Sequence, residues 1–283
     1  MGFLVCIILQ LFLKNNLPLN LNLTTLRMNT FETLLKKISN AKPLDFGKII
    51  SESIELFKKV WLKGFLIMLF LVIAAVCIAF AFRLIGLAPD PFDLNNGFSF
   101  ETVTGFYSQN AIYSIPQTIL ISTLTLAFVA AFYRICKQVD SGENVNDDYF
   151  YFFNKSYFTK VFMLGIIHAL ISAVAQLLLF IPYIYVLVPL AYFAIILANN
   201  PDLSETEIVK ASFALGNKKW LITFGAMFVT GILGMLGMLA CGIGLFFTIA
   251  IVYLPVFLIY KEVIGFNTYS EIEQIGVNDD SDY

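Results

Sequence analysis

The sequence has few charged residues for its length. Only 13% of its 283 residues are Asp, Glu, Lys or Arg, and 59% are hydrophobic, whereas soluble domains average about 25% charged residues. A soluble globule of this size would lack the polar surface that water requires, so the composition excludes an ordinary soluble enzyme. The net charge of −2 gives no indication of nucleic-acid binding. The apolar excess instead indicates a protein embedded in lipid.

Residue types that carry chemistry are also scarce. His168 is the single histidine, which excludes metal centres built from several histidines. None of the 20 acidic residues falls inside a long apolar run, and intramembrane carboxylates are the usual means of coupling transport to ions. We find no nucleophile paired with a base. The sequence therefore predicts a protein that is not an enzyme, with no catalytic residues, no metal and no cofactor.

Long apolar runs are abundant. Residues 64–82 are 19 residues without a charge, which at about 1.5 Å per residue nearly match the roughly 30 Å of bilayer hydrocarbon. Two charge-free stretches of 40 residues, 161–200 and 221–260, would each form a helix of about 60 Å, so each must hold two spans and a turn. The breaks fall at Phe180-Ile181-Pro182 and near Gly242. The six predicted spans are residues 64–82, 113–133, 161–180, 183–199, 221–240 and 244–260.

The positions of Lys and Arg predict the topology. With the N-terminus inside, 17 of the 18 cations lie on one side of the membrane and only Arg83 lies outside. We therefore expect an all-α, polytopic helix bundle of the cell inner membrane, with six transmembrane helices in three hairpins, amphipathic interfacial helices and both termini in the cytoplasm. The expected organisation is an N-terminal extension and polar segment (1–43), a six-span membrane domain (44–262) and an acidic tail (263–283).

The first 27 residues allow two interpretations. Residues 2–13 are apolar but carry no preceding cation and no cleavage motif, so they do not resemble a signal peptide and are short for a span. They are either an interfacial anchor or untranslated, with the true start at Met28.

The chain contains an internal repeat. Residues 44–65 match residues 203–224 at 8 of 22 positions, and the two tryptophans of the chain, Trp61 and Trp220, coincide. Asp45 and Ser204 both stand at predicted helix N-caps, and Ser204 with Glu207 matches a capping box. A weaker third copy precedes residue 161. The alternative is that any helix entering a membrane shows this order of residues.

Each copy places apolar residues at helical spacing, then lysines, then tryptophan. This order is typical of an amphipathic helix in the membrane interface that turns down into the bilayer. The candidate lipid-facing residues are Lys48, Lys58, Lys59, Trp61, Lys210, Lys218, Lys219 and Trp220.

These residues carry a family resemblance. The pattern Leu203-Ser204-x-x-Glu207 with Ser212, Leu215 and Trp220, together with Phe180-Ile181-Pro182, resembles the integral-membrane region associated with some glycerophosphodiester phosphodiesterases and related uncharacterised six-span bacterial inner-membrane proteins. The likeness covers roughly residues 44–262. This chain has Tyr183 where that family usually has glycine. The resemblance implies the six-span fold and no catalytic residues, and no soluble stretch is long enough for the phosphodiesterase domain.

Polar side chains within the spans form two stripes. One follows the second span at Ser114, Thr118, Ser122 and Thr125, and the other follows the third span at His168, Ser172 and Gln176. These stripes are either a polar seam that passes a small ligand or ordinary interhelical hydrogen bonding, which we favour.

Small residues recur in the fifth and sixth spans. Gly231, Gly234, Gly237 and Gly244 lie at helical spacing, which predicts close helix packing rather than a site. The acidic tail after Lys261 has no cation, and we expect it to be solvated.

The leading functional hypothesis is a non-enzymatic membrane protein that organises or handles membrane lipids or partner proteins through its interfacial helices. Its expected partners are the lipid bilayer, anionic lipids or another membrane protein. The alternative is a facilitative transporter or channel for a neutral or weakly polar solute that uses the polar seam. The substrate, the physiological partner and the oligomeric state do not follow from the sequence.

Overall fold

The computed structural model describes residues 31–87, 100–143, 147–177, 181–239, 242 and 244–266. Every regular element in this part of the chain is helical. After a helix over residues 31–39, the elements are α3 (Phe46–Leu84), α4 (Phe100–Ser141), η2 (Tyr151–Phe153), α5 (Lys155–Leu177), α6 (Ile181–Asn199), α7 (Glu205–Lys218), α8 (Trp220–Met235), η3 (Leu236–Leu239), α9 (Gly244–Thr248), η4 (Ile249–Tyr253) and α10 (Leu254–Val263). The first 30 residues, and with them the two interpretations of the N-terminus, lie outside the described residues.

Six helical segments of the described chain are long and apolar enough to cross a membrane: Phe46–Leu84, Ile115–Ser141, Lys155–Gln176, Pro182–Asn199, Trp220–Leu239 and Gly244–Val263. In the described part of the chain, the predicted all-helical fold with six apolar segments of membrane-spanning length is therefore confirmed. The hairpin pairing and the side on which the termini lie stay predictions. Helices α3 and α4 extend well beyond the predicted spans, residues 64–82 and 113–133, because the helical backbone hydrogen bonding continues into the more polar residues on either side of each span.

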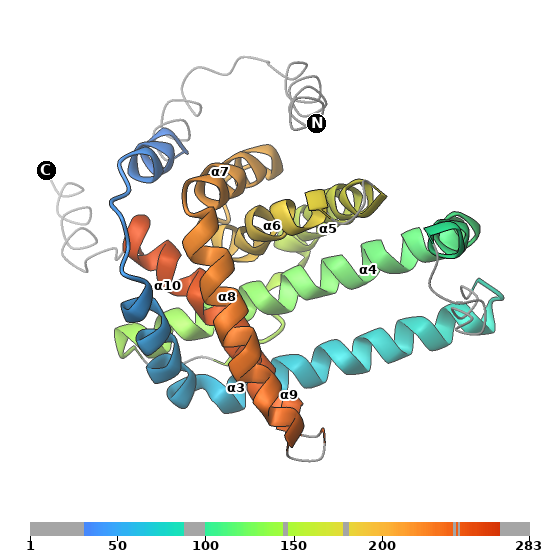
Figure 1. The fold of residues 1–283 in the computed structure, drawn as a ribbon, viewed down its shortest axis with the longest axis horizontal. Coiled ribbons are helices and arrows are strands. Elements are labelled where there is room, and N and C mark those ends of the chain that lie inside the picture. Colours follow the sequence, from blue (N-terminus) through green and yellow to red (C-terminus); the bar gives the residue numbers. More distant parts are fainter. Residues whose placement is uncertain are drawn as a thin grey trace, which may run out of the picture.

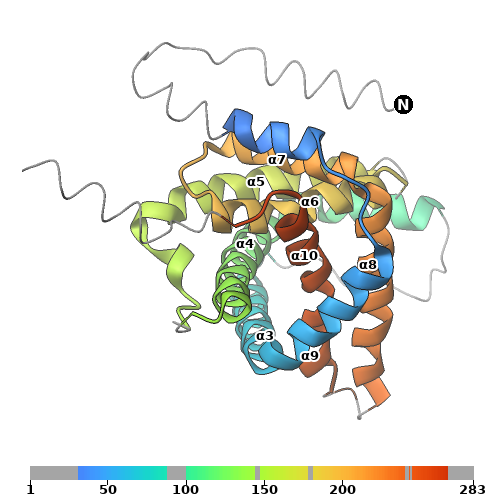
Figure 2. The same ribbon diagram turned by 90° about the vertical axis from the view of Figure 1, so that its left-hand side faces the viewer.

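Helix α3 joins two predicted elements in one helix. Asp45 is its N-cap, and its carboxylate accepts a hydrogen bond from the backbone N–H of Lys48 at 2.7 Å. The ribbon bends between the start of α3 (blue) and its far end (cyan), as both views show (Figure 1, Figure 2). The predicted interfacial and spanning segments of the first copy are thus continuous, whereas in the second copy Lys219 separates α7 from α8.

The core lies where the second half of α4 meets α6 and α10. Residues 126–133 of α4, 192–197 of α6 and 254–260 of α10 are buried throughout. Figure 1 shows that α8 crosses the direction of α4 and of the far half of α3 rather than running parallel to them. Exposed apolar side chains gather instead on the far half of α3, where Val76 and Phe80 are 61% and 62% exposed. Such a surface suits contact with lipid chains.

The last apolar segment consists of three short helices instead of one. Thr248 Oγ1 donates to the carbonyl of Gly234 at 2.5 Å, and η4 follows directly. Pro255 stands in the first turn of α10, where its missing N–H leaves no helical hydrogen bond unmade. Pro255 therefore stands where a new helix begins and does not kink a continuous one. Pro189, in contrast, lies inside α6.

Candidate functional site

Helices α3 and α7, which carry the first two copies of the predicted repeat, bury matching stripes of side chains. In α3 the stripe includes Ile49, Ser53 and Leu56, and in α7 its counterparts are Ile208, Ser212 and Leu215. Ser53 and Ser212 each donate to the carbonyl of the isoleucine four residues earlier, both at 2.8 Å. Their identical burial and hydrogen bonding agree with the alignment of the two copies at an offset of 159.

The apolar stripe of α7 packs on protein. Helix α7 lies against α6, and an added Cβ at Gly216 would stand 2.6 Å from Cα of Pro189. We expected the apolar faces of the amphipathic helices to lie in the membrane interface. The structure covers this face with α6, so α7 leaves mainly its lysine-bearing side uncovered.

Two of the predicted lipid-facing lysines form ion pairs within the chain. Lys48 Nζ lies 2.6 Å from Glu262 Oε1 and 3.7 Å from Glu52 Oε1, and Lys58 Nζ lies 2.6 Å from Glu55 Oε1.

Lys219 is buried at the junction of α7 and α8, and its ammonium group donates to the carbonyl of Lys42. Burial, with a smaller contribution from the charge of Lys218, lowers the pKa of Lys219 below its usual value. Lys219 therefore links the junction of α7 and α8 to the segment that contains Lys42, and it is not a lipid contact.

The other predicted residues remain accessible. Lys59, Lys210 and Lys218 are exposed. Trp61 is 44% exposed, whereas Trp220 is half-buried, donates from Nε1 to the carbonyl of Tyr185 at 3.0 Å and stacks on Phe224. In both copies the leucine after the tryptophan is exposed, Leu62 at 52% and Leu221 at 77%.

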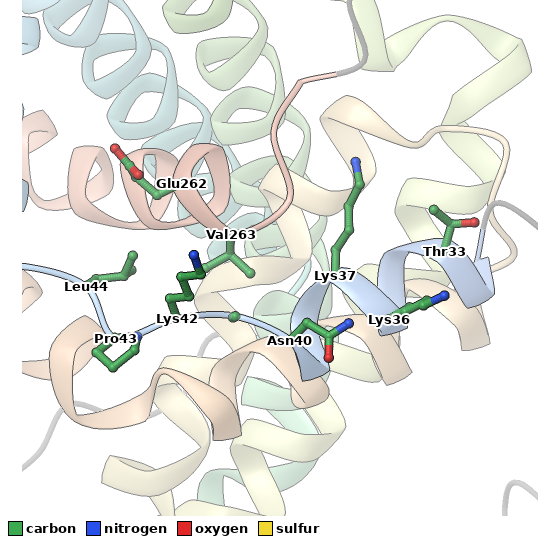
Figure 3. A pocket seen from close by; sticks show the side chains of 10 residues that line it. Thr33, Lys36, Lys37, Asn40, Lys42, Pro43, Leu44, Glu262 and Val263 are labelled. Atoms are coloured by element: carbon green, nitrogen blue, oxygen red, sulfur yellow. The ribbon is translucent and has the colours of Figure 1, made fainter.

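A basic hollow lies where the first described helix meets the end of α10 (Figure 3). Its volume is about 580 Å³, and it is lined by Thr33, Lys36, Lys37, Asn40, Ala41, Lys42, Pro43, Leu44, Glu262 and Val263. Lys37 Nζ donates to the carbonyl of Ile264 at 2.8 Å, and the buried side chains of Leu34 and Ile38 fix the helix over residues 31–39. We call this feature the basic hollow. Sequence reasoning missed it because its two walls are more than 200 residues apart.

A second, smaller hollow has a volume of about 110 Å³ and is lined by Arg134, Gln138, Asp148 and Tyr151, among others. The guanidinium carbon of Arg134 lies 3.1 Å from the ring centroid of Tyr151, a cation–π contact. Near it, burial with the charge of Asp147 raises the pKa of Tyr149 to about 12.

The predicted polar seam is only partly enclosed. Ser122 on α4 and Ser172 on α5 are buried, Thr125 and Gln176 are half-buried, and Thr118 is exposed. The side chain of Ser114 lies outside the described part. Neither of the two hollows is lined by a seam residue.

His168 turns toward α6, where its ring meets the edge of Phe193 at a centroid distance of 5.9 Å. Its Nδ1 is buried and has no hydrogen-bond partner among the described residues. The contact between α4 and α5 instead centres on Gly165, where an added Cβ would stand 2.1 Å from Thr123 Oγ1. Sequence reasoning had not singled out Thr123.

The glycine series meets the last apolar segment. An added Cβ at Gly237 would stand 2.5 Å from the carbonyl oxygen of Gly244, and one at Gly234 would stand 3.3 Å from Cα of Ile249. Gly231 differs, because the nearest atom to its added Cβ is Val252 Cγ2 at 4.0 Å.

No group of three or more His, Cys, Asp or Glu side chains among the described residues is placed to hold a metal ion. No family model, no curated protein and no solved structure matches this chain.

Proposed function

We propose that this multi-pass membrane protein organises or handles lipids of the cytoplasmic leaflet through the outward sides of α3 and α7. One observation carries the proposal: in both predicted copies an exposed lysine is followed three residues later by an exposed leucine. These pairs are Lys59 and Leu62 in α3, and Lys218 and Leu221 at the junction of α7 and α8. A cation beside an apolar side chain suits the boundary between headgroups and acyl chains.

Electrostatics gives the proposal a magnitude. A lysine near an anionic leaflet contributes about 1 kcal/mol, equivalent to roughly a fivefold preference for anionic lipid. Lys59, Lys210 and Lys218 would supply this preference, because Lys48, Lys58 and Lys219 have partners within the chain. The inner membrane, with both termini in the cytoplasm, is the location that the lysine distribution favours. The resemblance to the membrane region beside some glycerophosphodiester phosphodiesterases agrees with lipid handling and stays a proposal.

Tryptophan fluorescence offers a direct test, because the chain has two tryptophans and both lie beside these lysines. The protein is reconstituted into phosphatidylcholine nanodiscs that contain brominated phosphatidylglycerol or, in a parallel sample, brominated phosphatidylcholine. We expect stronger quenching by the brominated anionic lipid. The variant Lys59→Gln/Lys218→Gln should reduce this preference toward the neutral-lipid level, with Lys210 retaining the remainder. Lys155→Gln is the matched control, since Lys155 is exposed outside both helices. Equal quenching by the two brominated lipids in the unmodified protein would exclude anionic-lipid selectivity.

The second candidate is facilitated passage of a neutral or weakly polar solute. The observation that favours it is the Nδ1 of His168, which is buried and has no partner in the part of the chain that the structure describes, since such a group in an apolar region is typical of functional positions. Solute uptake into proteoliposomes tests it, with Ser122→Ala and His168→Ala as the variants. Unchanged flux and unchanged solute-dependent stability in both variants would reject the pathway.

A further inference from the structure

The basic hollow has an excess of positive charge. Three lysines line it, and its one carboxylate, that of Glu262, is already paired with Lys48. Among the described residues no carboxylate forms a salt bridge with Lys36, Lys37 or Lys42. Within the described part of the chain, Lys37 donates to the neutral carbonyl of Ile264. The three lysines that line the hollow thus have no anionic partner among the described residues.

The chain itself leads an acidic segment to this place. The described part ends at Phe266, two residues after the carbonyl that Lys37 binds, and Val263 is part of the wall. Residues 267–283 contain no Lys or Arg and carry five carboxylates, those of Glu271, Glu273, Asp279, Asp280 and Asp282.

We propose that the acidic segment after Phe266 binds the basic hollow of its own chain. Reach permits the contact: the seven residues from Ile264 to Glu271 span up to about 25 Å at 3.3–3.6 Å each. The residue from which the segment continues is fixed by packing: the ring centroid of Phe266 lies 5.1 Å from that of Phe257 and 6.0 Å from that of Tyr260. A short tether makes the binding intramolecular, with an effective concentration in the millimolar range.

An acidic segment bound in the hollow would compensate the positive charge of its lysines, whereas a solvated tail would leave that charge uncompensated. Attraction between the carboxylates and the lysines would be screened by salt, as expected for partly exposed charges. The proposal does not depend on lipid binding by α3 and α7, since it uses none of their exposed lysines.

Zero-length carbodiimide cross-linking tests the contact. The full chain is reconstituted into phosphatidylcholine nanodiscs, treated with carbodiimide, digested and analysed by mass spectrometry. We expect amide cross-links from Glu271 or Glu273 to Lys36, Lys37 or Lys42, about tenfold more abundant than those to the exposed controls Lys155 and Lys210. They should fall at about 0.5 M NaCl. The pair of Lys48 and Glu262, 2.6 Å apart, is the internal positive control.

Substitution makes the test specific. Lys36→Gln/Lys42→Gln should reduce the cross-links of the tail, including those to Lys37, and should leave the control pair and the thermal stability unchanged. Lys155→Gln/Lys210→Gln is the matched control and should change nothing. Mixing ¹⁴N- and ¹⁵N-labelled protein identifies the chain that supplies each carboxylate.

Several outcomes would overturn the proposal. Tail cross-links directed to Lys137, spread evenly over exposed lysines, or absent while the control pair reacts would each reject it. Cross-links between labelled and unlabelled chains would assign the tail to a second copy. Phosphate-bearing lipid that copurifies with the unmodified protein but not with Lys36→Gln/Lys42→Gln, without tail cross-links, would assign the hollow to lipid.

Discussion

The contact between Gly64 of α3 and Ala250 of η4 offers a quantitative test of how the last apolar segment packs on the first. An added Cβ at Gly64 would stand 2.5 Å from the Cβ of Ala250. Carbon atoms in contact normally lie about 3.5–4.0 Å apart, so Gly64→Ala must push the two elements apart by roughly 1 Å. Such overpacking costs about 1–3 kcal/mol.

The assay is the free energy of unfolding in mixed detergent micelles, with the melting temperature as a second readout. Each kcal/mol should lower the melting temperature by roughly 2–4 °C for a chain of this size. Ala250→Gly alone should cost about 1 kcal/mol. In the double variant Gly64→Ala/Ala250→Gly the new methyl group takes the place of the old one, because the next atom, Phe132 Cζ, is 3.6 Å away. We therefore expect a favourable coupling energy of roughly 1–2 kcal/mol between the two substitutions.

Gly231→Ala is the matched control. The nearest atom to its added Cβ is 4.0 Å away, so this change should be neutral or stabilise by up to about 1 kcal/mol through helix propensity. If Gly64→Ala were as stable as Gly231→Ala, or if Ala250→Gly failed to restore stability, the packing of η4 on α3 would be refuted.

Three further predictions concern buried polar groups. Thr223 Oγ1 donates to the carbonyl of Lys219 and lies 2.7 Å from the hydroxyl of Tyr192. Thr223→Ala should lower the free energy of unfolding by about 1–3 kcal/mol and Tyr192→Phe by only about 0.5–1.5 kcal/mol, because the loss of Thr223 Oγ1 leaves the buried hydroxyl of Tyr192 unpaired. Equal losses for the two variants, measured by unfolding in detergent, would contradict this prediction. Burial lowers the pKa of Lys219, so the folded state releases its proton at a lower pH than the unfolded state, and stability should rise as the pH approaches the ordinary value of 10.5 from below. Lys219→Met should lack this rise, and parallel pH profiles would disprove the burial argument. Ser53→Ala and Ser212→Ala should each change stability by less than about 1 kcal/mol and by similar amounts, because each hydroxyl bonds only within its own helix; a large difference in melting temperature would show that the two copies are not equivalent.

Local chemistry in the sequence anticipated local structure well. Ser204 forms the predicted capping box: its backbone N–H donates to Glu207 Oε2 at 2.7 Å, and its side chain accepts from the backbone N–H of Glu207. Asp45 caps α3 as expected. These predictions hold because a cap joins residues only three positions apart, so its partners are present in the sequence pattern.

The candidate site was less predictable. The repeat pointed to six lysines, yet the ion pair of Lys48 joins it to Glu262, 214 positions away, and Lys219 donates to Lys42, 177 positions away. A charge pattern along a chain cannot reveal which side chains folding removes from the surface. The basic hollow escaped notice for the same reason.

The sequence by itself determined that the chain forms six apolar helical segments, because the length of each charge-free run is set against the fixed thickness of lipid hydrocarbon. It also determined the start of α3 and of α7, because capping is local. Only the tertiary structure decided which cations remain exposed, which face of α7 is covered by α6, and that residues 33–44 and 262–263 enclose one hollow. Those outcomes depend on contacts between residues far apart in the chain, and such contacts exist only after the helices have packed.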